Sequence, residues 1–178
     1  MTDNKRSAAA YAAAWLFTLL GGYHTARAAY DNLTLASMFS SQGFMLGLAG
    51  SKLPVELPPL ARFAAANIRL MFLLYFFVSL GVFMTGIGLL LRKAWALAAA
   101  RRFFYSVSAV LFAIFLVPGL LVPKPLIFDG VAVSPEFNAA VGWMKVQLRL
   151  ATALLGSVFF WAALWCGRPG IKGEFGPR

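Results

Sequence analysis

The sequence has little charge, one cysteine and one histidine. Charged residues make up 12% of its 178 residues, against roughly 25% in an average soluble domain. Apolar residues make up 61%, and the mean hydropathy is +0.76. A soluble domain of this size could not bury so much apolar surface, because small folds leave much of their surface in water. The composition excludes a disordered chain, a coiled coil and an ordinary soluble domain, and it predicts a membrane protein.

The scarcity of cysteine and histidine excludes several kinds of site. With Cys166 alone, the chain can form neither an intrachain disulfide nor a cysteine-based metal site. With His24 alone, His-rich metal sites and bis-histidine haem ligation within one chain are excluded as well. We therefore predict no metal site.

Four apolar segments predict an all-α, polytopic membrane protein of a single domain, residues 1–178. We place the spans at about residues 8–23, 70–91, 101–117 and 146–165. They are expected to close into a four-helix transmembrane bundle. Residues 31–59 and 118–135 then form the two connections on one side, called the outer side here.

Local signals predict where the helices begin and end. The first helix is expected from about Asn4 to Tyr30, as an uncleaved span that stops at Asp31-Asn32. The second is expected to open at Pro58 or Pro59 and to continue unbroken to about Leu91. The last is expected to begin at Pro135, with Ser134 as its N-cap, and the tail after it to be irregular.

The outer connections predict a small cap. Residues 33–50 are too polar for a clear span and too apolar for a free loop, which favours an interfacial or re-entrant helix over a fifth span. Asp129-Gly130 lies between two short β-prone runs, a pattern typical of a β-hairpin.

The basic residues predict orientation and partners. Nine of the sixteen Lys and Arg residues lie on the side of the termini, and four of these cluster around the second turn, at Arg92, Lys93, Arg101 and Arg102. The positive-inside rule then predicts a bacterial inner (plasma) membrane protein with both termini cytoplasmic. The formal net charge of +10 favours anionic lipid headgroups as partners, and not nucleic acid, because the cations flank apolar runs.

Small residues predict close helix packing. They recur at helical spacing in the first span, at Ala10, Ala14, Thr18 and Gly22, and in the second, at Gly81, Thr85 and Gly88. Small side chains let helix backbones approach closely in lipid. For the first span, a merely alanine-rich helix is the alternative interpretation.

The outer helix ends carry the candidate binding residues, His24, Arg27, Arg69 and Arg149. In a closed bundle they would share one depth and form a cationic pocket for a lipid headgroup or a quinone carbonyl. His24 is also chemically able to ligate a haem or other pigment. The alternative is ordinary snorkelling of long cationic side chains at the membrane interface.

No motif in the chain indicates catalysis. No Asp or Glu lies within the predicted spans, which argues against an intramembrane protease or a carboxylate relay for ions. We therefore predict a non-catalytic subunit that packs against other integral membrane subunits and lipid. A lipid- or quinone-handling protein that uses the cationic pocket is the first alternative, and an oligomeric channel or transporter component is the second.

Two short stretches resemble a known group of proteins. The stretch 47–54 (Gly-Leu-Ala-Gly-Ser-Lys-Leu-Pro) resembles a segment of small bacterial four-span proteins of the DoxX type. The run 86–95 (Gly-Ile-Gly-Leu-Leu-Leu-Arg-Lys-Ala-Trp) is similar to a helix turn in many such proteins. Neither stretch carries chemistry, so no function is transferred from the resemblance.

Overall fold

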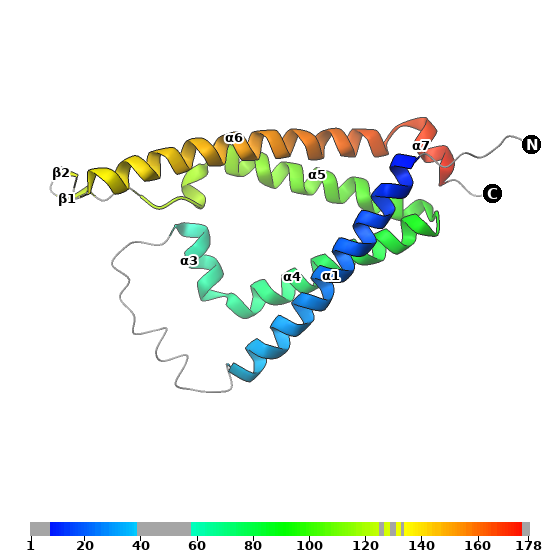
Figure 1. Ribbon diagram of the computed structural model, residues 1–178, viewed down its shortest axis with the longest axis horizontal. Coiled ribbons are helices and arrows are strands. Elements are labelled where there is room, and N and C mark those ends of the chain that lie inside the picture. Colours follow the sequence, from blue (N-terminus) through cyan, green and yellow to red (C-terminus); the bar gives the residue numbers. More distant parts are fainter. Residues whose placement is uncertain (1–7, 39–57, 125–126, 129–130, 133, 176–178) are drawn as a thin grey trace, which may run out of the picture.

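The computed structural model describes residues 8–38, 58–124, 127–128, 131–132 and 134–175, and these are mostly helical (Figure 1). The helices are α1 (Ala8–Met38), α3 (Pro59–Ala66), α4 (Ile68–Leu90), α5 (Ala94–Leu116), α6 (Pro135–Cys166) and α7 (Pro169–Glu174), with a 3-10 turn η1 (Pro118–Leu120). Two two-residue strands, β1 (Ile127–Phe128) and β2 (Val131–Ala132), pair antiparallel. The predicted all-α class is confirmed.

By length and composition, three described helices are able to cross a membrane: α4, α5 and α6. They confirm a membrane protein and cover three of the four predicted spans. Helix α1 is not among them, although it is 31 residues long. Its many alanines add little hydropathy, and His24, Arg27 and Asp31 lower it further. The structure thus supports three candidate spans where the sequence predicted four.

The helices pack as two antiparallel pairs, and the predicted four-helix bundle is not supported. Helix α1 packs along α4, and α5 packs along α6. Figure 1 shows the two pairs meeting at the end that holds the α4–α5 turn and α7, and diverging from there. We call this end the apex and the two pairs the arms. At the other end, which we call the far end, α3 turns away from α4 and contacts η1.

Helices α1 and α4 approach most closely where glycine leaves space. A Cβ added to Gly86 would lie 2.5 Å from the backbone nitrogen of Thr18, and one on Gly21 would lie 2.6 Å from that of Phe83. No Cβ fits at such distances, so both positions require glycine. The contacts run in opposite directions along the two helices, from Thr18 beside Gly86 to Asn32 beside Phe72.

The small residues predicted on the first helix face its neighbours. Ala10 and Ala14 are buried in the apolar cluster at the apex. A Cβ on Gly22 would lie 3.2 Å from the Phe83 ring, and Thr18 lies against Gly86. This stripe, together with the adjacent Gly21, forms the α1 side of the arm.

The small residues predicted on the second span differ in their surroundings. Thr85 is buried, and its hydroxyl donates to the carbonyl of Gly81 at 2.7 Å. A Cβ on Gly88 would collide with Trp95 and Ala96, so this glycine permits the α4–α5 turn to fold back. Gly81 itself lies in open space, with nothing within 4 Å of an added Cβ. The closest approach on α4 is therefore at Gly86, which the predicted stripe did not include.

A buried hydrogen bond joins the second arm. The hydroxyl of Ser108 on α5 donates to the carbonyl of Gly156 on α6 at 2.9 Å. The Thr152 hydroxyl, by contrast, donates within its own helix, to the carbonyl of Leu148. In membranes such an interhelical bond contributes about 0.6 kcal/mol on average. Ser108 thus links α5 directly to α6.

Three predicted helix limits are corrected. Helix α1 does not stop at Asp31-Asn32, because Asn32 donates to the carbonyls of Ala28 and Phe72 and so stays inside the helix. The second helix is broken at Asn67, whose side chain donates to the Phe63 carbonyl and competes with the regular ladder. The tail forms a short helix, α7, where an irregular segment was predicted. By contrast, α6 begins at Pro135 with Ser134 as N-cap, as predicted.

The predicted outer cap is not supported. Most of residues 33–50, the expected interfacial helix, lies outside the described residues, and the part that is described, 33–38, belongs to α1. The expected hairpin amounts to two residue pairs, Ile127 with Ala132 and Phe128 with Val131. Such a short ribbon is too small to cover the helix ends.

The turn between α4 and α5 is a Schellman motif with arginine at the left-handed position. Lys93 donates its backbone N–H to the Gly88 carbonyl at 2.8 Å, and Arg92 donates to Leu89 at 3.1 Å. Arg92 has a φ of 54°, a conformation that normally selects glycine. The apex therefore contains a strained residue at the point that joins the arms.

The glycines of α4 provide a test of the close approach. Gly86→Ala should destabilise the protein by about 1–3 kcal/mol, because the added methyl group overpacks against the backbone of Thr18. Gly81→Ala is the matched control on the same helix and should leave stability unchanged or slightly higher. Thermal unfolding in neutral detergent measures both. Equal losses in the two variants would contradict the packing described.

The Schellman turn provides a second test. Arg92→Gly should stabilise the protein by about 1 kcal/mol, because glycine adopts the left-handed conformation without a Cβ penalty. Lys93→Gly removes the same charge from a residue with φ −77° and should give no gain. The unfolding midpoints of the two variants decide the matter, and a gain in Lys93→Gly alone would refute it.

Candidate functional site

His24 lies at the interface of α1 and α4. Its Nδ1 atom is 2.6 Å from the hydroxyl of Tyr75, and its ring makes edge contacts with Tyr23 and Tyr75. The imidazole and the phenol are exposed side chains that bond to each other. This contact joins the two helices of the arm, and it leaves Nε2 as the ring nitrogen to which a ligand could bind.

Arg27 lies one turn further along α1 and is paired within its own helix. Its Nε atom is 3.1 Å from the carboxylate of Asp31, and its guanidinium stacks near the ring of Tyr30 at 5.8 Å. The pair has i,i+4 spacing and the Arg27 side chain is 58% exposed, so it contributes only about 0.3–0.5 kcal/mol. Arg27 is thus partly neutralised, in keeping with the snorkelling interpretation.

Arg69 lines a groove between α1 and α4 at the far end of the arm. The groove has a volume of about 470 Å³. Its lining is otherwise apolar apart from Asn32, and consists of Ala29, Leu33, Leu35, Ala36, Leu73 and Phe76. One cation beside an apolar groove suits an amphiphile. His24 and Arg27 do not line this groove.

Arg149 belongs to the other arm. It is an exposed residue of α6, a helix whose main contacts are with α5. Since the arms diverge from the apex, the structure does not bring Arg149 together with His24, Arg27 and Arg69 (Figure 1). A shared pocket of these four residues was expected only for a closed four-helix bundle, which the structure does not support.

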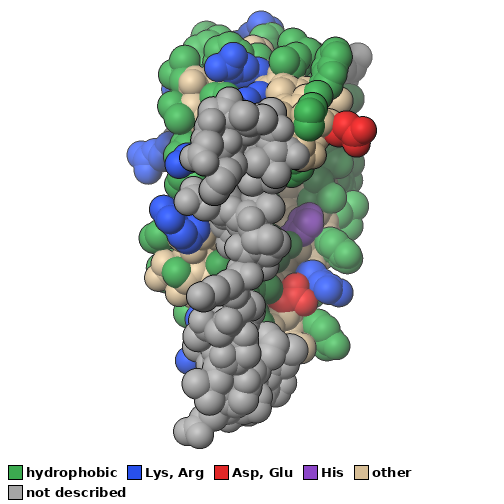
Figure 2. Space-filling view, turned by 90° about the vertical axis from the view of Figure 1, so that its left-hand side faces the viewer, with side chains coloured by type: hydrophobic (Ala, Val, Ile, Leu, Met, Phe, Trp, Pro, Cys, Tyr) green, Lys and Arg blue, Asp and Glu red, His purple; other side chains and the backbone are tan. Residues whose placement is uncertain are grey.

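The cationic side chains at the far end of the molecule are also dispersed. Figure 2 shows Lys and Arg side chains spread around this face among hydrophobic ones, with no single cluster on its visible part. Among the described residues, no three His, Cys, Asp or Glu side chains come together as metal ligands. The site that this face offers is thus the α1–α4 groove with Arg69.

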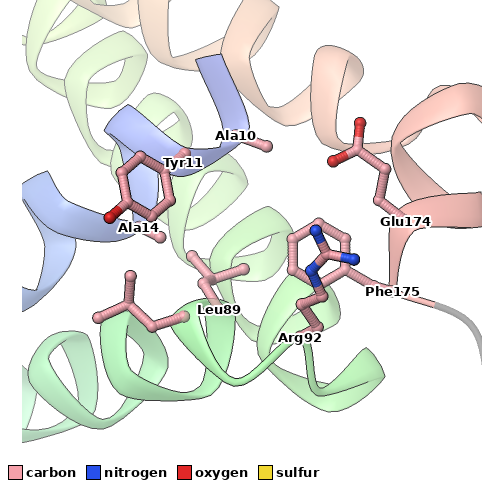
Figure 3. Close-up of a pocket in the computed structure, with 8 residues that line it drawn as sticks. Ala10, Tyr11, Ala14, Leu89, Arg92, Glu174 and Phe175 are labelled. Atoms are coloured by element: carbon pink, nitrogen blue, oxygen red, sulfur yellow. The ribbon is translucent and has the colours of Figure 1, made fainter. Parts of the chain in front are cut away.

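The apex holds two polar cavities that sequence reasoning missed. Figure 3 shows the smaller one, where Arg92 at the end of α4 and Glu174 of α7 lie beside Ala10, Tyr11 and Ala14 of α1. Its volume is about 20 Å³, room for about one water molecule. An acid and a base from separate elements thus share a small space between the arm and α7.

The larger apex cavity, of about 480 Å³, lies between α5, α6 and α7. Its cationic lining residues are Arg101, Arg102 and Lys172. The sequence showed Arg101 and Arg102 as part of a basic cluster, but that cluster served only as an indicator of orientation. The tail was expected to be irregular, so nothing in the sequence brought Lys172 beside them.

Comparison with protein families, curated proteins and solved structures finds no match for this chain. The function therefore has to be argued from the geometry alone.

Proposed function

We propose that this protein is a non-catalytic membrane subunit whose two arms pack against helices of other integral membrane proteins and against lipid. The observation that carries the proposal is the small share of each span that the chain itself covers. In the most apolar window of each helix, 17% of the residues are buried in α4, 11% in α5 and 17% in α6. Such open, apolar faces require neighbours in the bilayer.

The shape of the molecule supports the same proposal. Each long helix packs mainly against one other helix of the chain, and the arms diverge from the apex (Figure 1). In lipid, helix faces associate through shape and small residues and not through hydrophobicity as such. Leu19 on α1 and Leu154 on α6, 62% and 66% exposed, mark one such face on each arm.

The proposed topology follows from the pairing. Because α1 packs antiparallel along α4 over most of its length, we propose that it crosses the membrane with α4 as a fourth span. The apex carries Arg92, Lys93, Arg101 and Arg102 and would face the cytoplasm of a bacterium, with both termini on that side. A channel or transporter has less support, since no Asp or Glu lies in the membrane part of the three candidate spans.

The groove at Arg69 favours a second candidate function, the binding of a phospholipid or quinone. This site contains fewer cations than the expected pocket of four residues, because Arg69 lines the groove together with apolar residues of α1 and α4 and Arg149 does not. A single guanidinium can bond a phosphate or a quinone carbonyl while the apolar lining contacts the tail.

Photo-crosslinking in the native membrane tests the subunit proposal. A photoreactive residue at Leu19 or Leu154 should give a discrete adduct with a second integral membrane protein, because both positions are highly exposed and apolar. Position Gly170 in α7 has open space around it and lies outside the spans, so it should give none. Lipid adducts alone, together with a lone monodisperse monomer in mild detergent, would contradict the proposal.

Two arginine variants test the groove. Arg69→Gln should reduce the phospholipid or quinone that remains bound after purification, because it removes the cation that lines the groove. Arg149→Gln removes an equal charge from the other arm and should leave the bound amount unchanged. Equal occupancy in both variants and the unchanged chain would rule the groove out as a ligand site.

A further inference from the structure

We propose that the larger apex cavity is a binding site for a phosphate-bearing anion. It lies at the opposite end of the arms from Arg69, and it does not depend on the function proposed above. The phosphate group belongs either to an anionic phospholipid or to a free phosphate ion. Both sources present the same phosphate oxygens, and the binding experiment distinguishes them.

Three cationic side chains from two elements line the cavity. Arg101 and Arg102 come from α5, and Lys172 comes from α7, beyond the end of α6. Arg102 and Lys172 are exposed, so their charged groups can reach an anion from solvent or from the membrane surface. A guanidinium offers a planar fork of N–H donors, and an ammonium adds a mobile point charge, a combination suited to phosphate.

Arg101 is held by the protein but has an incomplete hydrogen-bond shell. Its guanidinium carbon lies 5.5 Å from the centre of the Tyr105 ring. A Cβ added to Gly167 would lie 3.3 Å from the same carbon, so the guanidinium packs against the α6–α7 turn. Its Nε atom is buried and has no hydrogen-bond partner among the described residues. Buried N–H groups are nearly always bonded, so this one indicates a missing acceptor.

Among the residues that the structure describes, no acidic side chain pairs with the three cations. The lining contains no Asp or Glu, and none of the three cations forms an ion pair with another described residue. Glu174, two residues after Lys172, lines the other apex cavity with Arg92 (Figure 3). Three like charges around one space repel each other, and a bound anion would replace that repulsion with attraction.

The rest of the lining suits a phosphate attached to an apolar body as well as a free ion. Between the cations the cavity is lined by Ala94, Leu97, Ala98, Tyr105, Cys166 and Phe175. The cavity also lies at the end of the spans where the α4–α5 turn emerges, which is headgroup depth if α4 and α5 cross the bilayer.

Binding to the full chain in neutral detergent, after removal of native lipid, tests the site. One experiment measures the binding of dioctanoyl phosphatidylglycerol by native mass spectrometry. The other measures the binding of radiolabelled inorganic phosphate by equilibrium dialysis. We expect one bound molecule per chain in at least one of the two experiments. Lipid alone identifies a headgroup as the source, and phosphate binding identifies a free ion. The absence of binding in both experiments would overturn the proposal.

Charge variants locate the binding. Arg102→Gln with Lys172→Gln should weaken it about 25-fold, since each cation near an anionic headgroup contributes roughly fivefold. Lys93→Gln with Arg168→Gln removes two exposed cations at the same end that do not line the cavity, and should weaken it far less. An equal loss in both double variants means general surface attraction and refutes a built site.

A glycine variant tests the geometry without any change of charge. Gly167→Ala would place a methyl group 3.2 Å from the Leu164 carbonyl oxygen and 3.3 Å from the Arg101 guanidinium carbon, so the guanidinium has to shift by a few tenths of an ångström. Binding should weaken while all three cations remain. Thermal unfolding of the same sample shows that the chain is folded, and unchanged affinity in folded Gly167→Ala would contradict a site that depends on the present position of the Arg101 guanidinium.

Discussion

The structure depends on the apolar cluster at the apex, where the two arms are joined. The buried members of this cluster come from every long helix of the fold and from α7: Ala10, Ala14, Leu89, Ala96, Leu97, Ala100, Cys166, Ile171 and Phe175. Five of these nine residues are alanine or cysteine. Small side chains allow several helix ends to converge in one place, and α7 then covers the end of the cluster. Beyond the cluster, each arm is held by its own contacts: glycine against backbone in one, a serine hydrogen bond in the other.

This constraint separates the charged residues into two groups with different chemistry. At the far end the arms have diverged, so His24, Arg27 and Arg69 stay with α1 and α4 while Arg149 stays with α6. At the apex the same helices converge, and residues 71 positions apart in sequence, Arg101 and Lys172, line one cavity. Any multi-residue binding chemistry is therefore more readily built at the apex than at the outer ends, where the sequence pattern first suggested it.

The sequence predicted those features that depend on local chemistry. The membrane class follows from composition, and the start of α6 follows from Ser134 and Pro135. Pairing was harder to foresee, because span sequences that are apolar all round show no preferred face. Asn32 lies within α1 and donates to the carbonyl of Phe72, a partner 40 residues away that the local sequence does not reveal. The cationic cavity depends on α7, a helix that the glycine-rich sequence of the tail did not predict. From the sequence alone, Gly81 was as good a candidate for close helix packing as Gly21 and Gly86. Only the position of the neighbouring backbone shows that Gly21 and Gly86 lie at the contact and Gly81 does not.

The separation of the charged residues into two groups depends on the divergence of the arms from the apex. Pulsed electron resonance distances between spin labels test it, with one pair near the apex, at Tyr11 and Leu164, and one pair at the far end, at Leu33 and Trp143. All four positions are exposed, so the labels need not disturb packing. The divergent arms predict a far-end distance much longer than the apex distance. Equal distances, both near the roughly 10 Å spacing of packed helices plus the label lengths, would mean a closed four-helix bundle and would contradict the account.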